Sequence, residues 1–132
     1  MIVLDLDDFD ALVQRVSRDA ADAMLRDLGG LLHSQVRKED LACRCGTHRF
    51  AIILPQGSLA AARERAESLR DLIRRLEVKE PGQPAVEITA SISVAAYPDH
   101  SRTIDELLRV AAEALSHARA AGGDCVLEGL RT

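Results

Sequence analysis

Apolar residues recur at helical spacing in three stretches of the chain. Residues 19–37 and 59–76 each carry an apolar stripe with the period of an amphipathic helix. A third helix is predicted after Thr103, whose side chain can cap it, and is expected to end near Ala121. The pair Gly29-Gly30 falls inside the first stripe and is expected to weaken that helix.

Four further stretches have the character of β-structure. Residues 2–9 begin as a compact apolar run and end in acids, and residues 41–54 form two short runs with a turn between them. Residues 86–98 alternate between apolar and polar side chains, and residues 125–129 make a short last strand. The predicted order is β-α-β-β-α-β-α-β, which indicates an α/β sandwich with a mixed central sheet and helices on both faces.

The composition excludes several classes of protein. With 132 residues, 47% of them hydrophobic, the chain is expected to fold as one globular domain with its own core. A net charge of −4 and an aromatic content of 2% argue against binding of DNA or RNA. The first residues lack the basic region of a signal peptide, and no apolar run is long enough to span a bilayer. We therefore expect a cytoplasmic domain that does not insert into a membrane.

The three cysteines are expected to be reduced thiols, because their number is odd and the sequence has no secretory features. Cys43 and Cys45 would point to the same face of a strand. They can hold a metal or serve as two small core residues. The second interpretation is favoured, because no second pair of ligands has the spacing of a metal site.

Five segments match, in order and at the same spacing, the motifs of one known family. They are LDLDDF (4–9), RKED (37–40), GTHRFAIILP (46–55), ITASISVAAYP (88–98) and AAEALSHARAAGGDCV (111–126). The chain thus resembles the GGDEF domains of diguanylate cyclases, which share a palm-like fold with other nucleotidyl cyclases. The resemblance implies a single GGDEF domain over residues 1–132. We expect it to have been cut from a larger multidomain signalling protein, without the D-x-L-T-G-L-x-N-R segment that precedes the first strand in the family.

The segment that gives the family its name is altered in this chain. In place of G-G-[DE]-E-F the sequence has Gly46, Thr47, His48, Arg49 and Phe50, so only the first glycine and the phenylalanine remain. By resemblance, active members join two GTP molecules into cyclic di-GMP with the help of two divalent cations. The degenerate signature therefore predicts the loss of this chemistry.

The resemblance implies that the cations would be bound by Asp5, the backbone carbonyl of Leu6 and an acid at position 48. A neutral imidazole at His48 is a poor ligand for Mg²⁺, and Arg49 adds a positive charge beside the site. The Cβ of Thr47 would crowd the approach of the backbone to phosphate. We expect Asp5 and Leu6 to be the vestige of a metal site.

These residues also have purely structural interpretations. Asp5, Asp7 and Asp8 can form a solvated acidic end of the first strand. His48 is expected to be a surface residue of the hairpin rather than a ligand. Arg49 can be the cross-strand partner of an acid.

Recognition of GTP is also expected to be damaged. The asparagine that contacts guanine in the family aligns with Val13, whereas its aspartate partner is kept as Asp22. Of two cationic residues near the terminal phosphates, one aligns with Arg119 and the other with Gly123. We predict no cyclase activity and no required cofactor. Mg²⁺ would matter only if GTP still binds through Asp22 and Arg119.

Arg37 and Asp40 keep the R-x-x-D motif, which by resemblance binds cyclic di-GMP at an inhibitory site. Arginine can donate two hydrogen bonds to guanine, and aspartate can accept from the other edge of the base. The structural alternative is an ion pair between these two side chains at a helix end. An arginine that often assists from the next helix aligns with Ser68, for which Arg65 or Arg70 can substitute.

Three functions remain open from the sequence. The two without cyclase activity are favoured over the third, and the sequence barely decides between them. The first is an inactive GGDEF domain that senses cyclic di-GMP through Arg37 and Asp40. The second is a dimerisation or interaction module that regulates a neighbouring EAL or sensor domain, either without nucleotide or with GTP as an effector. The third is an active cyclase with unusual ligands, which product formed from GTP with Mg²⁺ or Mn²⁺ would reveal.

Overall fold

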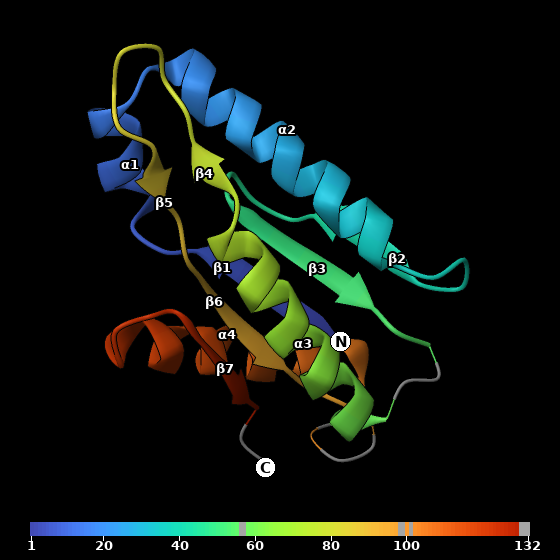
Figure 1. Ribbon diagram of the computed structural model, residues 1–132. Coiled ribbons are helices and arrows are strands. Elements are labelled where there is room, and N and C mark those ends of the chain that lie inside the picture. The colour runs from blue at the N-terminus through green and yellow to red at the C-terminus, as the bar shows by residue number, and fades with distance from the viewer. Residues whose placement is uncertain (56–57, 98–99, 101, 130–132) are drawn as a thin grey trace.

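The computed structural model describes residues 1–55, 58–97, 100 and 102–129 (Figure 1). Its helices are α1 (Phe9–Arg15), α2 (Arg18–Gln35), α3 (Leu59–Arg74) and α4 (Ile104–Ala120). Its strands are β1 (Ile2–Leu6), β2 (Leu41–Arg44), β3 (Arg49–Ile53), β4 (Glu77–Val78), β5 (Val86–Glu87), β6 (Ala90–Val94) and β7 (Cys125–Glu128). None of the helices in these ranges is both long and apolar enough to cross a bilayer.

Five strands form one mixed sheet in the order β2-β3-β1-β6-β7. All neighbours in it are antiparallel except β6 and β7, which run parallel. β1 is the central strand, where Asp5 stands opposite Arg49 of β3 and Ser91 of β6. The predicted α/β fold with a mixed sheet is confirmed.

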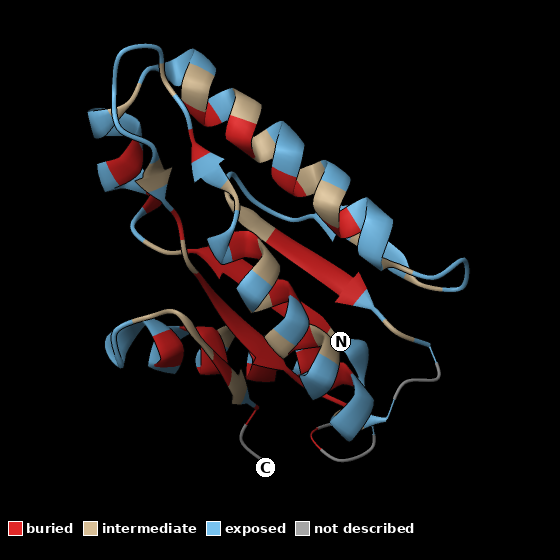
Figure 2. Ribbon diagram, in the orientation of Figure 1, coloured by how far each residue is buried: buried red, intermediate tan, exposed pale blue. Residues whose placement is uncertain are grey.

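Helices cover both faces of this sheet, as the sequence predicted (Figure 1). Because side chains alternate along β1, Leu4 faces a large apolar core under α2 and α3, whereas Val3 faces a second core under α4. Figure 2 shows the central strands and the inner sides of the helices as buried. Asp5, two positions after Val3, therefore lies on the side of α4.

α2 runs unbroken through Gly29 and Gly30, so the weakening expected there does not interrupt the helix. Its buried side chains, among them Leu28 and Leu32, hold one side of the helix against the core. A Cβ at either glycine would meet no atom within 4 Å. Tertiary packing of the apolar side thus outweighs the low helix propensity of the two glycines.

Two parts of the fold differ from the prediction. The run over residues 2–9 leaves the sheet at Leu6 and α1 follows, because Asp8 takes a left-handed conformation with φ 51° that turns the chain. The stretch predicted as one strand over 86–98 divides into β5, which pairs with β4 in a small separate sheet, and β6, which ends at Val94. Residue 98 lies outside the described residues. Elements this short contain too few apolar positions for periodicity to reveal them.

The interpretation of Cys43 and Cys45 as core residues is wrong. Both thiols are exposed, because β2 is an edge strand and α4 packs on β1, β6 and β7.

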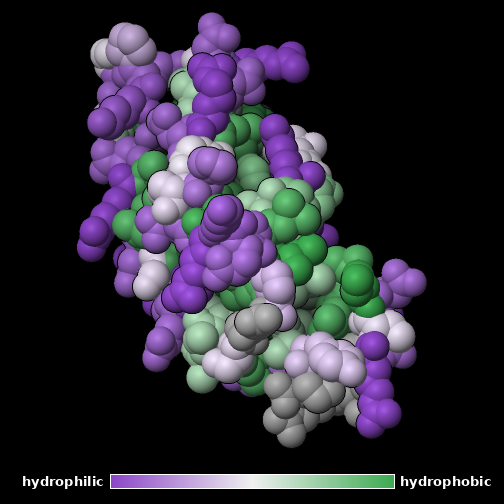
Figure 3. Space-filling view, turned by 90° about the vertical axis from the view of Figure 1, so that its right-hand side faces the viewer, coloured by the Kyte–Doolittle hydropathy of each residue, from purple (hydrophilic) through white to green (hydrophobic). Residues whose placement is uncertain are grey.

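Leu41 and Ile53, which stand opposite each other on β2 and β3, are exposed as well. Figure 3 shows that apolar side chains also gather down the middle of one side of the molecule, between hydrophilic margins. Part of the apolar surface is thus left for solvent or for another chain.

Candidate functional site

Asp5, near the end of β1, carries a buried carboxylate with a side chain only 2% exposed. Its Oδ2 accepts hydrogen bonds from Arg49 Nη2 (2.9 Å) and Nε (3.3 Å), and from Arg119 Nη1 (3.3 Å). Its Oδ1 is in contact with His48 Nδ1. Both oxygens of the carboxylate are therefore engaged by side chains of this chain.

The partners of Asp5 come from the hairpin and from α4. Arg49 is the cross-strand neighbour of Asp5 on β3, which confirms the predicted pairing of Arg49 with an acid. The backbone N–H of Leu6 donates to the carbonyl of His48 (3.1 Å), so the turn of the hairpin is bound to the end of β1. Arg119 comes from the last turn of α4. The resulting cluster joins β1, β3 and α4 around one carboxylate.

His48 is only in part the surface residue that the sequence suggested. Its imidazole contacts the carboxylate of Asp5 and stacks on the ring of Phe9, with 5.0 Å between the ring centroids. The side chain is therefore packed between β1 and the start of α1. Sequence reasoning missed this role, because it depends on how the turn folds back onto β1.

The other residues of the altered signature shape the turn itself. Phe50 is buried in the core under α2 and α3. The carbonyl of Gly46 accepts a hydrogen bond from Arg44 Nε (3.0 Å), and the carbonyl of Thr47 accepts from the Nη2 of the same side chain. Arg44 therefore pairs with two backbone carbonyls of the turn and stabilises it from within the hairpin.

The residues around Asp5 do not fit a resident divalent cation. Mg²⁺ takes several oxygen ligands, but of the set implied by the family only Asp5 and the carbonyl of Leu6 remain, and His48 offers nitrogen. Two guanidiniums at the carboxylate would repel the ion. Within the described ranges, no group of three or more histidine, cysteine, aspartate or glutamate side chains could hold a metal. The chemistry of the donor set thus argues against a metal centre here.

Asp7 has a structural role that the sequence did not reveal. Its Oδ1 accepts from Ser91 Oγ (2.6 Å), and its Oδ2 accepts from Thr89 Oγ1 (2.7 Å) and from the backbone N–H of Asp124 (2.8 Å). Gly123, at φ 73°, passes so close that a Cβ there would lie 2.7 Å from the carboxylate. Asp7 therefore ties β1 to β6 and to the turn before β7. The only signal in the sequence was the T-x-S pattern of the facing strand.

The residues expected to recognise guanine are not joined to the cluster around Asp5. Asp22 is exposed on α2 and has no hydrogen bond or ion pair within the part of the chain that the structure describes. Val13, which we expected at the position of the asparagine of the family, is 39% exposed on α1. Arg119 donates to Asp5. Of the residual nucleotide contacts that we expected, the structure brings only Arg119 into the cluster.

Arg37 and Asp40 form a tight turn after α2, and not the ion pair considered as the structural alternative. The backbone N–H of Arg37 donates to Asp40 Oδ2 (2.8 Å), and the N–H of Asp40 donates to the carbonyl of Arg37 (3.0 Å). Asp40 makes its ion pair with Arg65 of α3, whose Nη1 lies 2.8 Å from the same oxygen. Arg65 also donates to the carbonyl of Gln35. The guanidinium of Arg37 is exposed and makes no hydrogen bond or close ion pair with a described residue, although its charge contributes to lowering the pKa of Asp40.

The carboxyl group of Asp40 is held in its ionised form. Its side chain is 4% exposed, and burial alone would raise its pKa. The hydrogen bond from the Arg37 backbone and the charge of Arg65 outweigh this effect, so the pKa of Asp40 lies below its ordinary value. The group therefore remains a hydrogen-bond acceptor at neutral pH.

A cavity of about 230 Å³ adjoins this turn, and its lining comes from the end of α2 and from α3: Gln35, Glu64, Arg65, Ser68 and Leu69. Ser68, which aligns with the assisting arginine of the family, thus faces the same cavity as Arg65. Arg70 is directed elsewhere, since its Nη1 donates to the carbonyl of Asp124 (3.0 Å). Of the two possible substitutes, Arg65 is the one placed at the turn.

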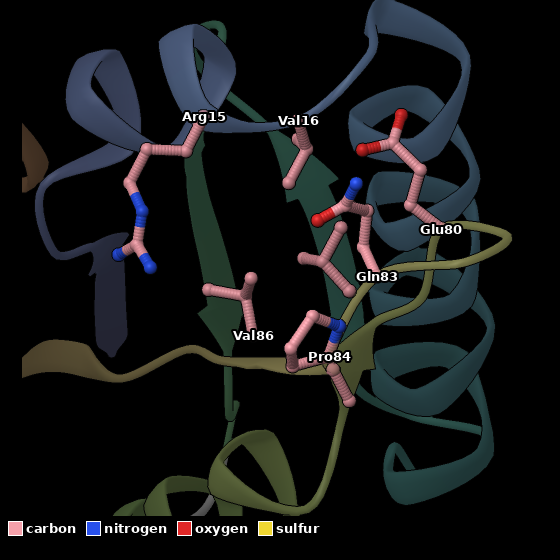
Figure 4. Close-up of a pocket in the computed structure, with 8 residues that line it drawn as sticks. Arg15, Val16, Glu80, Gln83, Pro84 and Val86 are labelled. Carbon is pink, nitrogen blue, oxygen red and sulfur yellow. The ribbon is translucent and has the colours of Figure 1, made fainter.

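A second cavity, of about 320 Å³, lies between the end of α1 and the β4–β5 sheet (Figure 4). Its lining combines apolar and polar side chains: Arg15, Val16, Val78, Glu80, Gln83, Pro84, Ala85 and Val86. Glu80 is already bound, because its Oε1 accepts from the backbone N–H of Ser17 (2.8 Å). The cavity shares no residue with the cluster around Asp5 or with the turn of Arg37 and Asp40.

The family of the chain follows from comparison with known proteins. Residues 1–125 match the family model described as diguanylate cyclase, GGDEF domain. The chain belongs to the GGDEF family. The response regulator PleD of Caulobacter vibrioides is 32% identical over 127 residues, which are 96% of this chain and 28% of PleD. Diguanylate cyclase VdcA of Vibrio cholerae is 40% identical over 96 residues, which are 71% of this chain and 28% of VdcA. This GGDEF chain thus spans little more than a quarter of these relatives.

Solved structures of the family share the fold of this GGDEF domain. The GGDEF domain of PA1120 from Pseudomonas aeruginosa aligns with a TM-score of 0.89 at 24% identity, over 99% of this chain and 81% of that one. Diguanylate cyclase SiaD from the same organism, in complex with its activator SiaC, aligns with a TM-score of 0.87 at 30% identity, over 97% of this chain and 48% of SiaD. The resemblance drawn from the motifs is therefore confirmed for the family and for the fold.

Proposed function

We propose that this GGDEF domain is a regulatory module of cyclic di-GMP signalling that forms no cyclic di-GMP itself. The observation that carries the proposal is the state of Asp5, whose two oxygens are engaged by His48, Arg49 and Arg119. Phosphoryl transfer between two GTP molecules depends on divalent cations that position the phosphates and neutralise their charge. A carboxylate that already neutralises two guanidiniums is a poor ligand for such a cation.

The altered signature removes several contributions to catalysis at once. Compared with the family signature, His48 and Arg49 stand in place of two acids. Thr47 stands in place of the second glycine, directly after Gly46. Removal of one preorganised electrostatic contact commonly costs about 10²–10³ in kcat. Since these changes meet at one site, we expect turnover to fall below detection.

The turn of Arg37 and Asp40 is the part of the domain that we propose to bind cyclic di-GMP. Arg37 presents an exposed guanidinium, and the Oδ1 of Asp40 has no hydrogen bond from a described residue. Arg65 pairs with Asp40 and lines the adjoining cavity. Such groups can donate two hydrogen bonds to guanine and accept from its other edge. The GGDEF domain of DgcB from Caulobacter crescentus, which has the same fold, was solved in complex with c-di-GMP.

Calorimetric titration of the purified domain with cyclic di-GMP tests this proposal. We expect binding in the micromolar range or tighter, weakened at least about tenfold in Arg37→Ala by the loss of a charge-assisted contact. Arg26→Ala, which removes an exposed arginine of α2, is the matched control and should bind as the wild type. A parallel assay with GTP and Mg²⁺ or Mn²⁺ should yield no product.

Two results would contradict the proposal in different parts. Product that forms from GTP and disappears in Asp5→Ala would show an active cyclase. Absence of both binding heat and a thermal shift at high cyclic di-GMP would remove the sensor role while leaving the inactive assignment in place.

The exposed pair of Leu41 and Ile53 favours a second function. An exposed apolar surface on the sheet suits contact with a second copy of the domain or with a neighbouring domain of the same protein. Among similar structures are an EAL/GGDEF domain protein from M. capsulatus and a sensory box/GGDEF family protein from Caulobacter crescentus. If cyclic di-GMP does not bind, the remaining function is dimerisation or interaction with another domain, with GTP at most as an effector. Light scattering of the wild type and of Leu41→Lys examines this function.

A further inference from the structure

Cys43 and Cys45 lie on the exposed side of the edge strand β2. Ala42 packs against the core under α2 and α3, and the guanidinium of Arg44 lies over the ring of Phe50 in the same core. Because side chains alternate along a strand, the two cysteines point to the opposite side of the sheet. α4 packs on that side against β1, β6 and β7. Both thiols are therefore open to solvent and to a ligand.

The backbone that carries these two thiols is fixed by hydrogen bonds. Cys43 stands opposite Ala51 of β3, and the N–H of Cys45 donates to the carbonyl of Arg49 (2.9 Å), so the pairing of strands continues one residue beyond β2. Arg44, which stands between the cysteines in the sequence, donates to two backbone carbonyls of the turn. The two sulfur atoms therefore start from fixed neighbouring positions on one surface.

The spacing of the two cysteines suits a bridging metal ion better than a disulfide. With a rise of about 3.3 Å per residue, the Cα atoms of residues two apart on a strand are separated by about 6.6 Å. A disulfide prefers a Cα separation of about 5.5–6 Å. An ion with metal–sulfur bonds of about 2.3 Å keeps its two sulfur atoms about 4 Å apart. Two side chains that lean towards each other from the same side of β2 reach that separation.

The two thiols are close enough for the charge of one to affect the other. Desolvation raises the pKa of Cys45, and the charges of Cys43 and Asp5 raise it further, whereas the guanidinium of Arg49 lowers it. Two free thiolates side by side would repel each other. A cation bound between them removes this repulsion, and Arg49 offsets part of the negative charge that remains.

The number of available ligands selects the kind of ion. In the part of the chain that the structure describes, no set of three or more histidine, cysteine, aspartate or glutamate side chains could hold a metal. A structural zinc ion takes four protein ligands, and an iron–sulfur cluster also requires four. Soft thiolates favour the cuprous ion, Cu(I), which is stable with two sulfur ligands in a linear arrangement. Two cysteines are a complete set for this ion alone.

We propose that Cys43 and Cys45 form a two-thiolate binding site for Cu(I). Binding replaces the two thiol protons by the ion, so two protons are released and copper keeps its oxidation state. The inference goes beyond the proposed regulatory function, since it concerns other residues and does not depend on binding of cyclic di-GMP.

Anaerobic titration of the reduced domain with Cu(I), in competition with the chromogenic ligand bicinchoninate, tests this site. We expect each chain to withdraw one Cu(I) from the coloured complex. Cys43→Ser and Cys45→Ser each remove one ligand and should lower the affinity at least about a hundredfold, more than the loss of a residue that only supports a ligand. Both residues are exposed, so the variants should keep the wild-type melting temperature without copper.

The third cysteine provides the matched control. The thiol of Cys125 donates to the carbonyl of Ala118 on α4 (3.8 Å), and Cys125→Ser should bind Cu(I) as the wild type. The proposal is overturned if Cys125→Ser loses the ion, or if Cys43→Ser and Cys45→Ser both compete with bicinchoninate as well as the wild type.

Two further results would also contradict a site within one chain. One Cu(I) for every two chains, together with a dimer in light scattering, would place the ion between two copies of the domain. Equally tight retention of Zn²⁺, measured against a chromogenic zinc ligand, would show that further ligands join the two thiols. Neither result would bear on the titration with cyclic di-GMP, so the two proposals fail separately.

Discussion

Asp5 is buried together with its charge, and a buried carboxylate is stable only when ionic or hydrogen-bonding partners replace its lost hydration. Arg49, Arg119 and His48 provide this compensation within the chain. The contact with Arg49 could be predicted, because a residue at the start of β3 faces the acid across the strand pair. The contacts with Arg119 and His48 could not, because they depend on how α4 and the turn pack against β1.

Replacement of this carboxylate should therefore cost stability. We expect Asp5→Asn to lower the free energy of unfolding by about 1–3 kcal/mol, since it removes charge-assisted hydrogen bonds and leaves two guanidiniums facing each other. Urea unfolding at neutral pH measures the effect, with the exposed Asp22→Asn as a control expected within about 0.5 kcal/mol of the wild type. In a domain whose buried acid had no cationic partner of its own, the same change would remove an uncompensated charge and raise the free energy of unfolding. A more stable Asp5→Asn variant would therefore disprove the compensation of Asp5 within the chain.

The lowered pKa of Asp40 makes a prediction about acid stability. In the unfolded chain the pKa of this carboxyl group is about 3.9, and in the folded domain its pKa is lower. Its ionised form therefore stabilises the fold above the unfolded value, and this contribution disappears as the pH falls through the folded value. Asp40→Asn should be less stable than the wild type at neutral pH and should converge with it in strong acid.

Urea unfolding at a series of pH values tests the role of Asp40. The exposed neighbour Glu39 provides the control, because Glu39→Gln should follow the wild-type profile. A difference between the wild type and Asp40→Asn that stays constant from neutral pH to pH 2 would contradict the assigned shift.

At the level of secondary structure, the long elements follow from local pattern and the short ones from tertiary contact. α4 begins where its sequence predicts, with Thr103 Oγ1 accepting from the backbone N–H of Glu106 (3.2 Å). By contrast, β4 and β5 have only two residues each, and their pairing could not be read from alternation. The R-x-x-D motif offered an ion pair between Arg37 and Asp40 as the structural interpretation. Asp40 instead forms its ion pair with Arg65 of α3, a helix that follows the hairpin in the sequence.

Two glycines in different elements should respond to alanine in opposite ways. Gly123→Ala should destabilise the domain by about 1–3 kcal/mol, because φ is 73° and the new Cβ would lie 2.7 Å from the carboxylate of Asp7. Gly30→Ala, inside α2 with no atom within 4 Å of the new Cβ, should stabilise it by about 0.5–1 kcal/mol. Thermal unfolding of both variants measures the contrast. Equal effects would mean that the turn before β7 does not depend on close approach to Asp7.

Over the whole molecule, α3 joins regions that are far apart in the sequence. Arg65 binds the turn after α2, and Arg70 binds the carbonyl of Asp124 in the turn before β7. Arg63 and Arg74 reach further acids, Glu128 of β7 and Glu87 of β5. The arginine-rich side of this helix thus contacts several other elements, whereas the exposed large apolar side chains of the described residues lie elsewhere, on α1, β2, β3, the stretch after β6 and the first turns of α4.

The way in which Asp5 is neutralised also has an evolutionary consequence. A glutamate restored at His48 would complete the ligand set of the family while Arg49 still donated to Asp5 and competed with any incoming ion. An acid at position 49 alone would remove one of the two guanidiniums that neutralise the buried carboxylate of Asp5, while His48 still offered nitrogen in place of an oxygen ligand. Neither single substitution thus provides two metal ligands that are free of a competing guanidinium. Both positions of this turn would therefore have to change together before a cation could bind beside Asp5 without competition from Arg49.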